Sequence, residues 1–261
     1  FTFGARLSRA WGERSRLTLF AALPVSHRGL RSASTEEAFT RTDDPYYNPA
    51  WGFQQGEVRS ARERGEWLPF VVGEWEQSLG ASTTLRAALA FQAGKSRQSA
   101  LGWYDARTPL PDNYRYMPSY TADRAAEEAW LAGDSRYTQI AWDELIVQNR
   151  LGDGEANYAL EDRVEAPMRA EARVSFTTRL ARTTLDYGVR LDWDHTRHYK
   201  EMNDLLGADY LVDIDQYLID DDSYRNLLEN NLKDPSRKIF EGDRFGYDYA
   251  LRRLESTLWL R

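Results

Sequence analysis

Apolar and polar residues alternate along several stretches of the chain. From residue 185 the even positions are charged or glycine, and the odd positions are apolar: Leu185, Tyr187, Val189, Leu191 and Trp193. Residues 168–180 repeat the pattern with mostly apolar even positions, among them Val174 and Phe176. Because successive side chains of a strand point to opposite faces, these stretches predict strands with one apolar and one polar face.

The same pattern predicts seven strands in all, near residues 2–11, 16–32, 66–79, 84–99, 167–181, 184–199 and 244–261. Their connections alternate between tight turns (12–15, 80–83, 182–183) and long segments (33–65, 100–166, 200–243). The long segments exceed the roughly 4–6 residues that usually join elements of a compact domain. In an up-and-down sheet, alternate connections lie at opposite ends. We therefore expect all tight turns at one end and all long loops at the other.

This asymmetry is typical of transmembrane β-barrels, which have short periplasmic turns, long extracellular loops and alternating strands whose apolar side chains face lipid. The predicted fold is all-β, an antiparallel up-and-down transmembrane barrel, of which residues 1–261 form a partial wall of about seven strands. The apolar positions of 185–193, with Val174 and Phe176, are the predicted lipid-facing residues. Short helices are predicted inside the long loops, over 123–132 and 224–232. A soluble β-sandwich is the alternative fold.

Aromatic residues near the strand ends predict two membrane-interface girdles. Trp11, Trp75 and Trp259 lie near tight-turn ends, and Trp193, Tyr199, Phe245, Tyr247 and Tyr249 lie near long-loop ends. Pro24 lies within the second predicted strand, where it removes a hydrogen-bond donor and predicts a bulge. The apolar phase of the last strand changes near Arg252 and Arg253, which predicts a second bulge there or an early strand end.

Composition removes several classes of protein. The 9 Trp, 15 Tyr and 10 Phe are too many for a disordered chain. The longest apolar run, residues 19–25, is too short to cross a membrane as a helix, which needs roughly 20 residues. A net charge of −7 without a basic block argues against nucleic-acid binding. The absence of cysteine excludes disulfides, thiolate zinc sites and cysteine nucleophiles.

Candidate catalytic and metal-binding residues are few. His195 and His198 are three apart, so on a strand they point to opposite faces and cannot hold one metal ion. Asp192 and Asp194 share a face with His198, which leaves a barrel-embedded hydrolase as a rival. Charges of both signs line most such barrels, however, so we expect no enzyme, no catalytic residue, no metal and no cofactor. The acidic segment 213–222 leaves calcium binding open, although it lacks the glycine and final Glu of an EF-hand.

Aromatic residues in the proline-containing loops are the candidate ligand contacts: Tyr46, Tyr47, Trp51, Tyr114 and Tyr116. Rigid aromatic surfaces on loops suit recognition of a ligand. The alternative is that these rings hold the loops together over the mouth of the barrel.

Four segments resemble the barrel region of TonB-dependent outer-membrane receptors, in the branch that often carries a carboxypeptidase-like regulatory domain upstream. They are Tyr47-Asn48-Pro49-Ala50-Trp51-Gly52, Glu241-Gly242-Asp243-Arg244-Phe245-Gly246-Tyr247-Asp248-Tyr249, Asp204-Leu205-Leu206-Gly207 and Asp213-Ile214-Asp215-Gln216. The resemblance implies a 22-stranded barrel filled by a plug. It also implies TonB-dependent import of a metal chelate, cobalamin, a glycan or a peptide.

The resemblance further implies a location in the outer membrane of a Gram-negative cell, with the long loops extracellular. The expected partners are outer-membrane lipid, a small-molecule, glycan or peptide ligand, and the TonB complex, reached through a plug outside this chain. A surface lipoprotein is a further candidate partner. The chain opens on Phe1 and stops inside a predicted strand, so we expect an interior section of a longer protein. A passive outer-membrane channel, the hydrolase and a soluble carbohydrate-binding sandwich stay open as alternatives.

Overall fold

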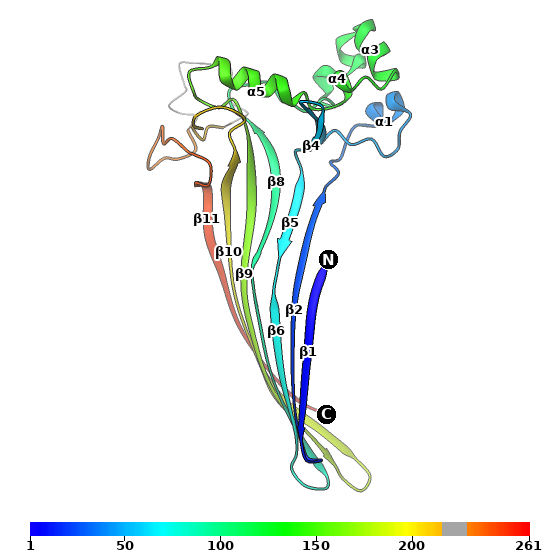
Figure 1. Cartoon of the computed structure of the whole chain (residues 1–261), viewed down its shortest axis with the longest axis vertical. Coiled ribbons are helices and arrows are strands. Elements are labelled where there is room, and N and C mark those ends of the chain that lie inside the picture. Colours follow the sequence, from blue (N-terminus) through cyan, green and yellow to red (C-terminus); the bar gives the residue numbers. More distant parts are fainter. Residues whose placement is uncertain (216–228) are drawn as a thin grey trace.

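A computed structural model describes residues 1–215 and 229–261, which form one long, curved antiparallel sheet beneath a head of loops and short helices (Figure 1). The sheet contains β1 (Thr2–Trp11), β2 (Ser15–Gly29), β5 (Glu63–Trp67), β6 (Phe70–Ser78), β7 (Thr83–Ala93), β8 (Lys95–Trp103), β9 (Tyr158–Arg179), β10 (Thr184–Asp204) and β11 (Arg244–Leu260). The head contains the hairpin β3 (Trp51–Gln54) and β4 (Glu57–Ser60), helices α1 (Glu36–Thr42), α2 (Pro118–Thr121), α3 (Arg124–Leu131), α4 (Ser135–Thr138) and α5 (Trp142–Leu151), and the 3-10 turn η1 (Tyr114–Tyr116).

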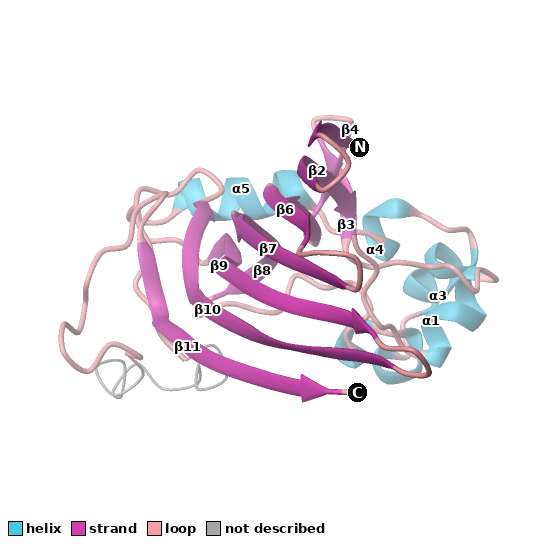
Figure 2. Cartoon of the chain, turned by 90° about the horizontal axis from the view of Figure 1, so that it is seen from below, coloured by secondary structure: helices cyan, strands magenta, loops and turns pink. Residues whose placement is uncertain are grey.

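Two pairs of short strands continue one another. β5 and β6 pair with β2 in a single register, from Val25 opposite Trp67 to Ala22 opposite Phe70, across an interruption at Pro69. Proline has no backbone N–H to give to the neighbouring strand, which explains the break. β7 and β8 likewise continue across Gly94. The sheet is thus a meander of seven long strands with tight turns at one end, as the alternation predicts (Figures 1 and 2).

Strand register places most of the exposed apolar residues of the seven long strands on one side of the sheet. One row of paired positions crosses the whole sheet: Leu7, Leu19, Gly73, Leu89, Ala172, Leu191 and Ser256. We call this the apolar side and its apolar rows the apolar band. The neighbouring row, Arg6, Phe20, Val72, Ala90, Glu171, Asp192 and Glu255, lies on the opposite, polar side.

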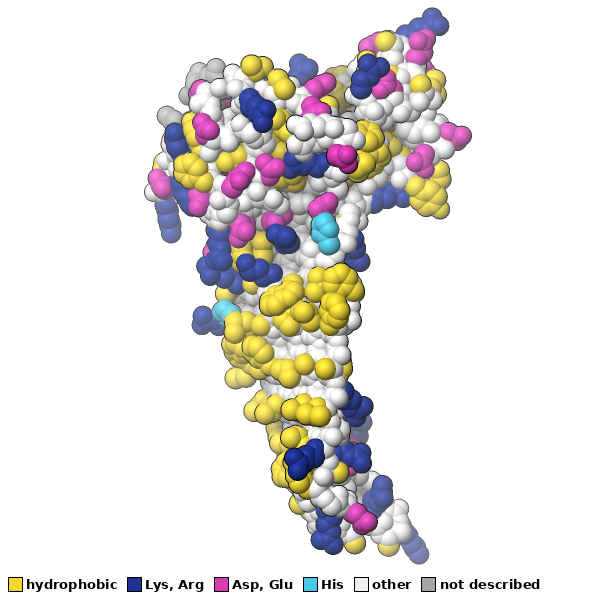
Figure 3. All heavy atoms as spheres, in the orientation of Figure 1, with side chains coloured by type: hydrophobic (Ala, Val, Ile, Leu, Met, Phe, Trp, Pro, Cys, Tyr) yellow, Lys and Arg dark blue, Asp and Glu magenta, His cyan; other side chains and the backbone are white. Residues whose placement is uncertain are grey.

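The apolar band is exposed. Leu89 is 67% exposed, Leu191 48% and Leu258 80%, and within residues 1–215 and 229–261 no second sheet covers them. Figure 3 shows hydrophobic side chains as a band across the strands, with charged side chains gathered on the head and near the turns. The predicted lipid-facing residues therefore share one open apolar surface.

Buried side chains concentrate in the head. Trp130, Trp142 and Leu211 are almost fully buried, each in a separate apolar cluster. β9 begins at Tyr158, earlier than the predicted residue 167, because residues 158–162 are buried on both faces beneath the head and so do not alternate. The predicted helix over 123–132 is confirmed by α3, whereas the prediction over 224–232 falls largely outside the described residues, as do Asp220, Asp221 and Asp222. No helix in the described parts of the chain has the length and apolar character needed to cross a membrane.

Both predicted bulges are wrong in position. The register of β2 runs unbroken past Pro24, whose carbonyl accepts a hydrogen bond from the Leu68 N–H at 3.3 Å. The register of β11 is also unbroken at Arg252 and Arg253, and its shift lies where Tyr199 and Lys200 of β10 pair with Asp248 and Phe245. Gly246, with a φ of 68°, takes up this bulge, since glycine adopts that conformation without strain.

Four aromatic residues do not join the predicted girdles. Tyr249 pairs with His198 on the polar side, where the two rings stack. Trp259 lies on the polar side, where its ring covers Gly188 and receives the guanidinium of Arg173 at 5.0 Å. Tyr199 and Phe245 are buried under the head rather than exposed at its edge.

Candidate functional site

The first loop (residues 30–62) and the second loop (104–157) fold together into the head. The Tyr47 hydroxyl donates to the Thr138 carbonyl at 2.8 Å, and the Ser34 hydroxyl donates to Asp112 at 2.7 Å. The Trp142 indole N–H donates to the Arg59 carbonyl at 3.0 Å. These contacts join residues far apart in sequence, so the head is one structured body.

A cleft of about 710 Å³ opens in the second loop, between residues 105–111 and helices α3, α4 and α5. Four aromatic residues line it: Tyr116, Trp130, Tyr137 and Tyr158. Its polar lining includes Arg107, Gln139, Glu144 and Gln148. Aromatic faces combined with a few polar groups are the usual composition of a small-ligand site.

Two tyrosine hydroxyls fix one wall of the cleft. Tyr116 donates to the Thr108 carbonyl at 2.8 Å, and Tyr158 donates to the Arg107 carbonyl at 3.1 Å. Burial raises the pKa of the Tyr116 phenol, so this hydroxyl stays protonated and keeps its donor role at neutral pH. Trp130 is 1% exposed and meets the Tyr47 ring edge-on, with centroids 5.7 Å apart. The wall is therefore held before any ligand arrives.

Gln139 carries an unused hydrogen-bond acceptor in this cleft. Its Oε1 atom is buried and has no hydrogen-bond partner among the described residues. Leaving a buried polar atom unpaired costs free energy, and a ligand in the cleft could pair with this oxygen only after the Gln139 side chain turned to expose it. No group of three described His, Asp or Glu residues is arranged to hold a metal ion.

The structure separates the five predicted ligand contacts. Tyr116 lines the cleft, whereas Tyr46 and Tyr114 are exposed on the head and do not line it. Trp51 is half-buried, with its ring centroid 5.5 Å from that of Phe53. Tyr47 is 4% exposed, and its ring and its hydroxyl hold the two loops together, which is the alternative role that the sequence left open for these rings.

Sequence reasoning missed most of the cleft: Arg107, Tyr137, Gln139, Gln148 and Tyr158. Trp130 lies within the predicted helix over 123–132, and a large apolar side chain in a loop helix could have indicated a buried position in the head. The others meet only because the second loop returns to the start of β9, a contact that no local pattern encodes.

The polar side of the sheet holds the residues of the hydrolase alternative. Asp194 accepts from Arg169 at 2.6 Å, and Asp192 accepts from Arg190 at 2.7 Å. His198 instead stacks on Tyr249, with ring centroids 5.1 Å apart. The carboxylates are thus bound to arginines and not to the histidine.

The two histidines lie on opposite sides of the sheet, as predicted. His195 is on the apolar side, where its ring stacks on that of Trp193, whereas His198 is on the polar side.

Comparison with known protein families found no match, and searches of curated proteins and of solved structures likewise found no similar protein. Function must therefore be inferred from the two-sided sheet and the cleft themselves.

One prediction concerns Asp112, which ties the two loops together. Burial raises the pKa of its carboxyl, so its stabilising contribution is full at acid pH and is lost as the pH rises through the raised value. Asp112→Asn removes the charge and retains an acceptor for Ser34. We expect this variant to slow proteolysis of the second loop at about pH 7 and to have no effect at about pH 3. A benefit that is equal at both pH values contradicts this reading.

Proposed function

We propose that this chain forms part of the wall and of the outer vestibule of a plugged outer-membrane receptor, which imports a nutrient with energy from the TonB complex. The supporting observation is the sheet: an exposed apolar band on one side, charged residues on the other, tight turns at one end and a folded head at the other. This combination is the usual form of a transmembrane barrel wall.

The exposed apolar area argues for contact with lipid. Soluble monomers rarely expose an apolar patch larger than a few hundred Å², and this band extends over seven strands. Burying one leucine side chain in an apolar medium contributes roughly 1.5–3 kcal/mol, so a surface carrying Leu7, Leu89, Leu191 and Leu258 strongly favours acyl chains over water. β9 and β10 have 22 and 21 residues, enough to cross the hydrocarbon and to continue toward the head.

The head supplies the ligand side of this proposal. Its cleft offers aromatic faces and several polar side chains, which suit a small polar ligand such as a glycan, a peptide or a chelate. The TonB complex is reached through a plug that is not in this chain.

The uptake proposal is tested by growth. Cells with and without the intact protein are compared on glycans, peptides, cobalamin and ferric chelates, each as the only source of carbon, nitrogen, cofactor or iron. We expect one nutrient to support growth only when the protein is present, and this advantage to disappear when TonB is deleted. An advantage that persists without TonB favours a passive channel.

A second prediction concerns Tyr137, which lines the cleft and is 42% exposed. Tyr137→Ala removes an aromatic contact that is worth about 1–3 kcal/mol, so we expect ligand affinity to fall about tenfold without loss of folded protein. Tyr46→Ala is the matched control, because Tyr46 is exposed on the same head but outside the cleft. Equal losses of uptake in the two variants contradict a role for the cleft.

A further inference from the structure

Cations border the apolar band on the side nearest the head. Lys95 of β8, Ala166 of β9 and Arg197 of β10 lie in one row across three neighbouring strands. The next row toward the tight turns contains Met168 of β9, His195 of β10 and Arg252 of β11. All of these positions lie on the apolar side. The apolar band therefore ends at a layer of positive charge.

The lowest cations of this layer have few carboxylate partners. Lys95 is exposed and forms no ion pair with the described residues. The Arg252 Nε–H donates to His195 Nδ1 at 3.2 Å and not to a carboxylate. Arg197 binds Asp248 through two contacts of 2.6 Å, but Asp248 also receives Arg244 at 3.4 Å, so two arginines share one carboxylate. The charge of this patch is incompletely balanced.

Arg97 lies one row closer to the head than Lys95, and its partner Asp162 lies one row beyond Arg97. Its guanidinium is 3.8 Å from Asp162 and 66% exposed. The order from the band toward the head is therefore apolar residues, then cations, then carboxylates, and a ligand that rests on the band meets the cations first.

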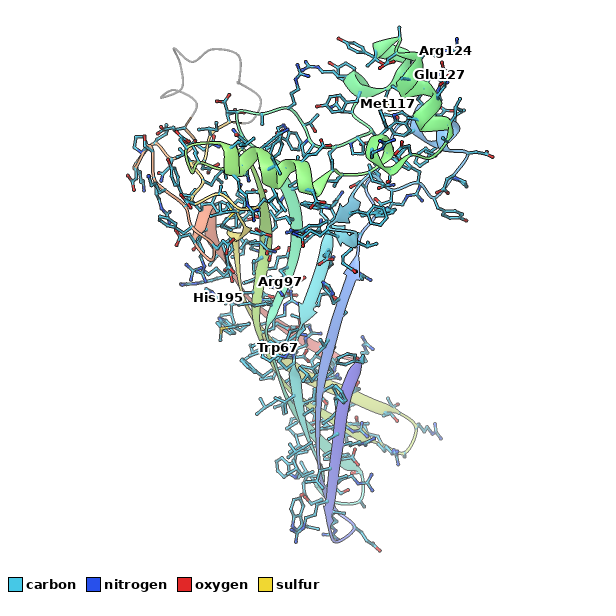
Figure 4. The ribbon with its side chains drawn as sticks, turned by 45° about the horizontal axis from the view of Figure 1, so that its top comes forward. Trp67, Arg97, Met117, Arg124, Glu127 and His195 are labelled. Carbon is cyan, nitrogen blue, oxygen red and sulfur yellow. The ribbon has the colours of Figure 1, made fainter. Side chains whose placement is uncertain are left out.

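Aromatic rings accompany these cations. Trp67 is the direct cross-strand neighbour of Lys95 and is 52% exposed. The Trp193 ring stacks on His195, with centroids 6.1 Å apart and planes at 8°. Figure 4 labels Trp67, Arg97 and His195 between the head and the lower strands. Tryptophan prefers the headgroup level of a membrane, which places the cations at phosphate depth.

The geometry of the patch leaves room for an anion. Ala166 is the small residue between Lys95 and Arg197, whose strands are about 10 Å apart because neighbouring strands lie 4.7–4.9 Å apart. The long side chains of Lys95 and Arg197 thus stand on either side of the short side chain of Ala166, with space above it for an anion. Because Arg252 donates to Nδ1 of His195, the neutral imidazole carries its proton on Nε2 and offers another donor.

We propose that Lys95, Arg197, Arg252 and His195 bind the phosphate groups of an outer-leaflet lipid whose acyl chains lie on the apolar band. This proposal rests on the proposed outer-membrane location. Juxtamembrane Lys and Arg are attracted to an anionic lipid surface, and the attraction rises when several converge on one headgroup.

The test uses the intact protein in phosphatidylcholine vesicles that contain bis-phosphorylated lipid A. Lipid retained after extraction is counted by native mass spectrometry. We expect lipid A to be retained and Lys95→Gln/Arg197→Gln/Arg252→Gln to weaken retention about tenfold or more. Lys95→Arg, which conserves the charge, should retain lipid A normally. Arg9→Gln, at the opposite end of the apolar side, should also have little effect.

The outcomes are distinguishable. Dephosphorylated lipid A should not stay bound to the protein after extraction. Free inorganic phosphate should not displace bound lipid A, and displacement by free phosphate overturns the lipid assignment. The phosphate site alone is overturned by either of two results with protein that inserts into the vesicles. In the first, the protein retains lipid A no better than phosphatidylcholine. In the second, the triple variant retains as much lipid A as the wild type. Protein that does not insert at all overturns the proposed function on which the site rests.

Discussion

Leu89→Arg is expected to reduce folded protein in the outer membrane to less than about a tenth of the wild-type level, because arginine at the middle of a lipid-facing strand costs roughly 2–4 kcal/mol. Leu89 lies in the central row of the apolar band and is 67% exposed, so its replacement removes little packing within the protein. The measurement is the heat-modifiable, folded band on gels of isolated outer membranes.

Ala88→Arg is the matched control for this variant. Ala88 is the adjacent residue on the polar side, where it pairs with Glu74 of β6 and Arg173 of β9. An arginine there has a carboxylate beside it and water around it, so near-normal levels are expected. If Leu89→Arg is tolerated as well as Ala88→Arg, the apolar band does not face lipid.

Asn149→Leu is expected to loosen the head while leaving the sheet intact. The Asn149 amide donates to the carbonyls of Tyr158 and Leu205 at 2.8 and 2.9 Å and accepts from the N–H groups of Asn157 and Tyr158 at 3.0 and 3.1 Å. It is 1% exposed, so leucine leaves four buried backbone groups without this partner. At about 1–3 kcal/mol for each unsatisfied group, a loss of several kcal/mol is expected.

Hydrogen exchange measures this effect directly. Amides of α5 and of the first residues of β9 should exchange much faster in Asn149→Leu, whereas those of β10 near Leu191 should be unchanged. Val147→Ala serves as the control, because Val147 is exposed on the same helix and makes no comparable contacts. Normal protection in Asn149→Leu would show that this amide does not hold the head together.

The sheet could be predicted from sequence because alternation is a local property. Leu185 to Trp193 reveal their shared face without knowledge of any neighbour, and the short and long connections then set the order of strands. The start of β9 was predicted too late because residues near Tyr158 are buried on both faces and do not alternate. Trp259 was assigned to the wrong face because the face of an odd position in β11 is fixed by its pairing with β10.

The cleft was largely beyond sequence reasoning. Tyr46 and Tyr47 are adjacent in the same proline-containing loop, yet one is 79% exposed and the other 4%. The difference arises from Thr138 and Trp130, which lie more than eighty residues away and take the Tyr47 side chain into the head. Local composition indicates that a loop is rigid, but not which ring of the loop meets a ligand.

The most direct test of the account is a scan of spin-label accessibility along residues 185–194 of β10. The chain contains no cysteine, so each cysteine introduced here is the only one it contributes. In the intact protein in lipid vesicles, labels at odd positions should collide with oxygen dissolved in the acyl chains, and labels at even positions with a water-soluble nickel chelate. This strict alternation is the predicted result. Labels at Leu191 and Asp192 that both meet the chelate, or that are both shielded from either reagent, would contradict a membrane wall.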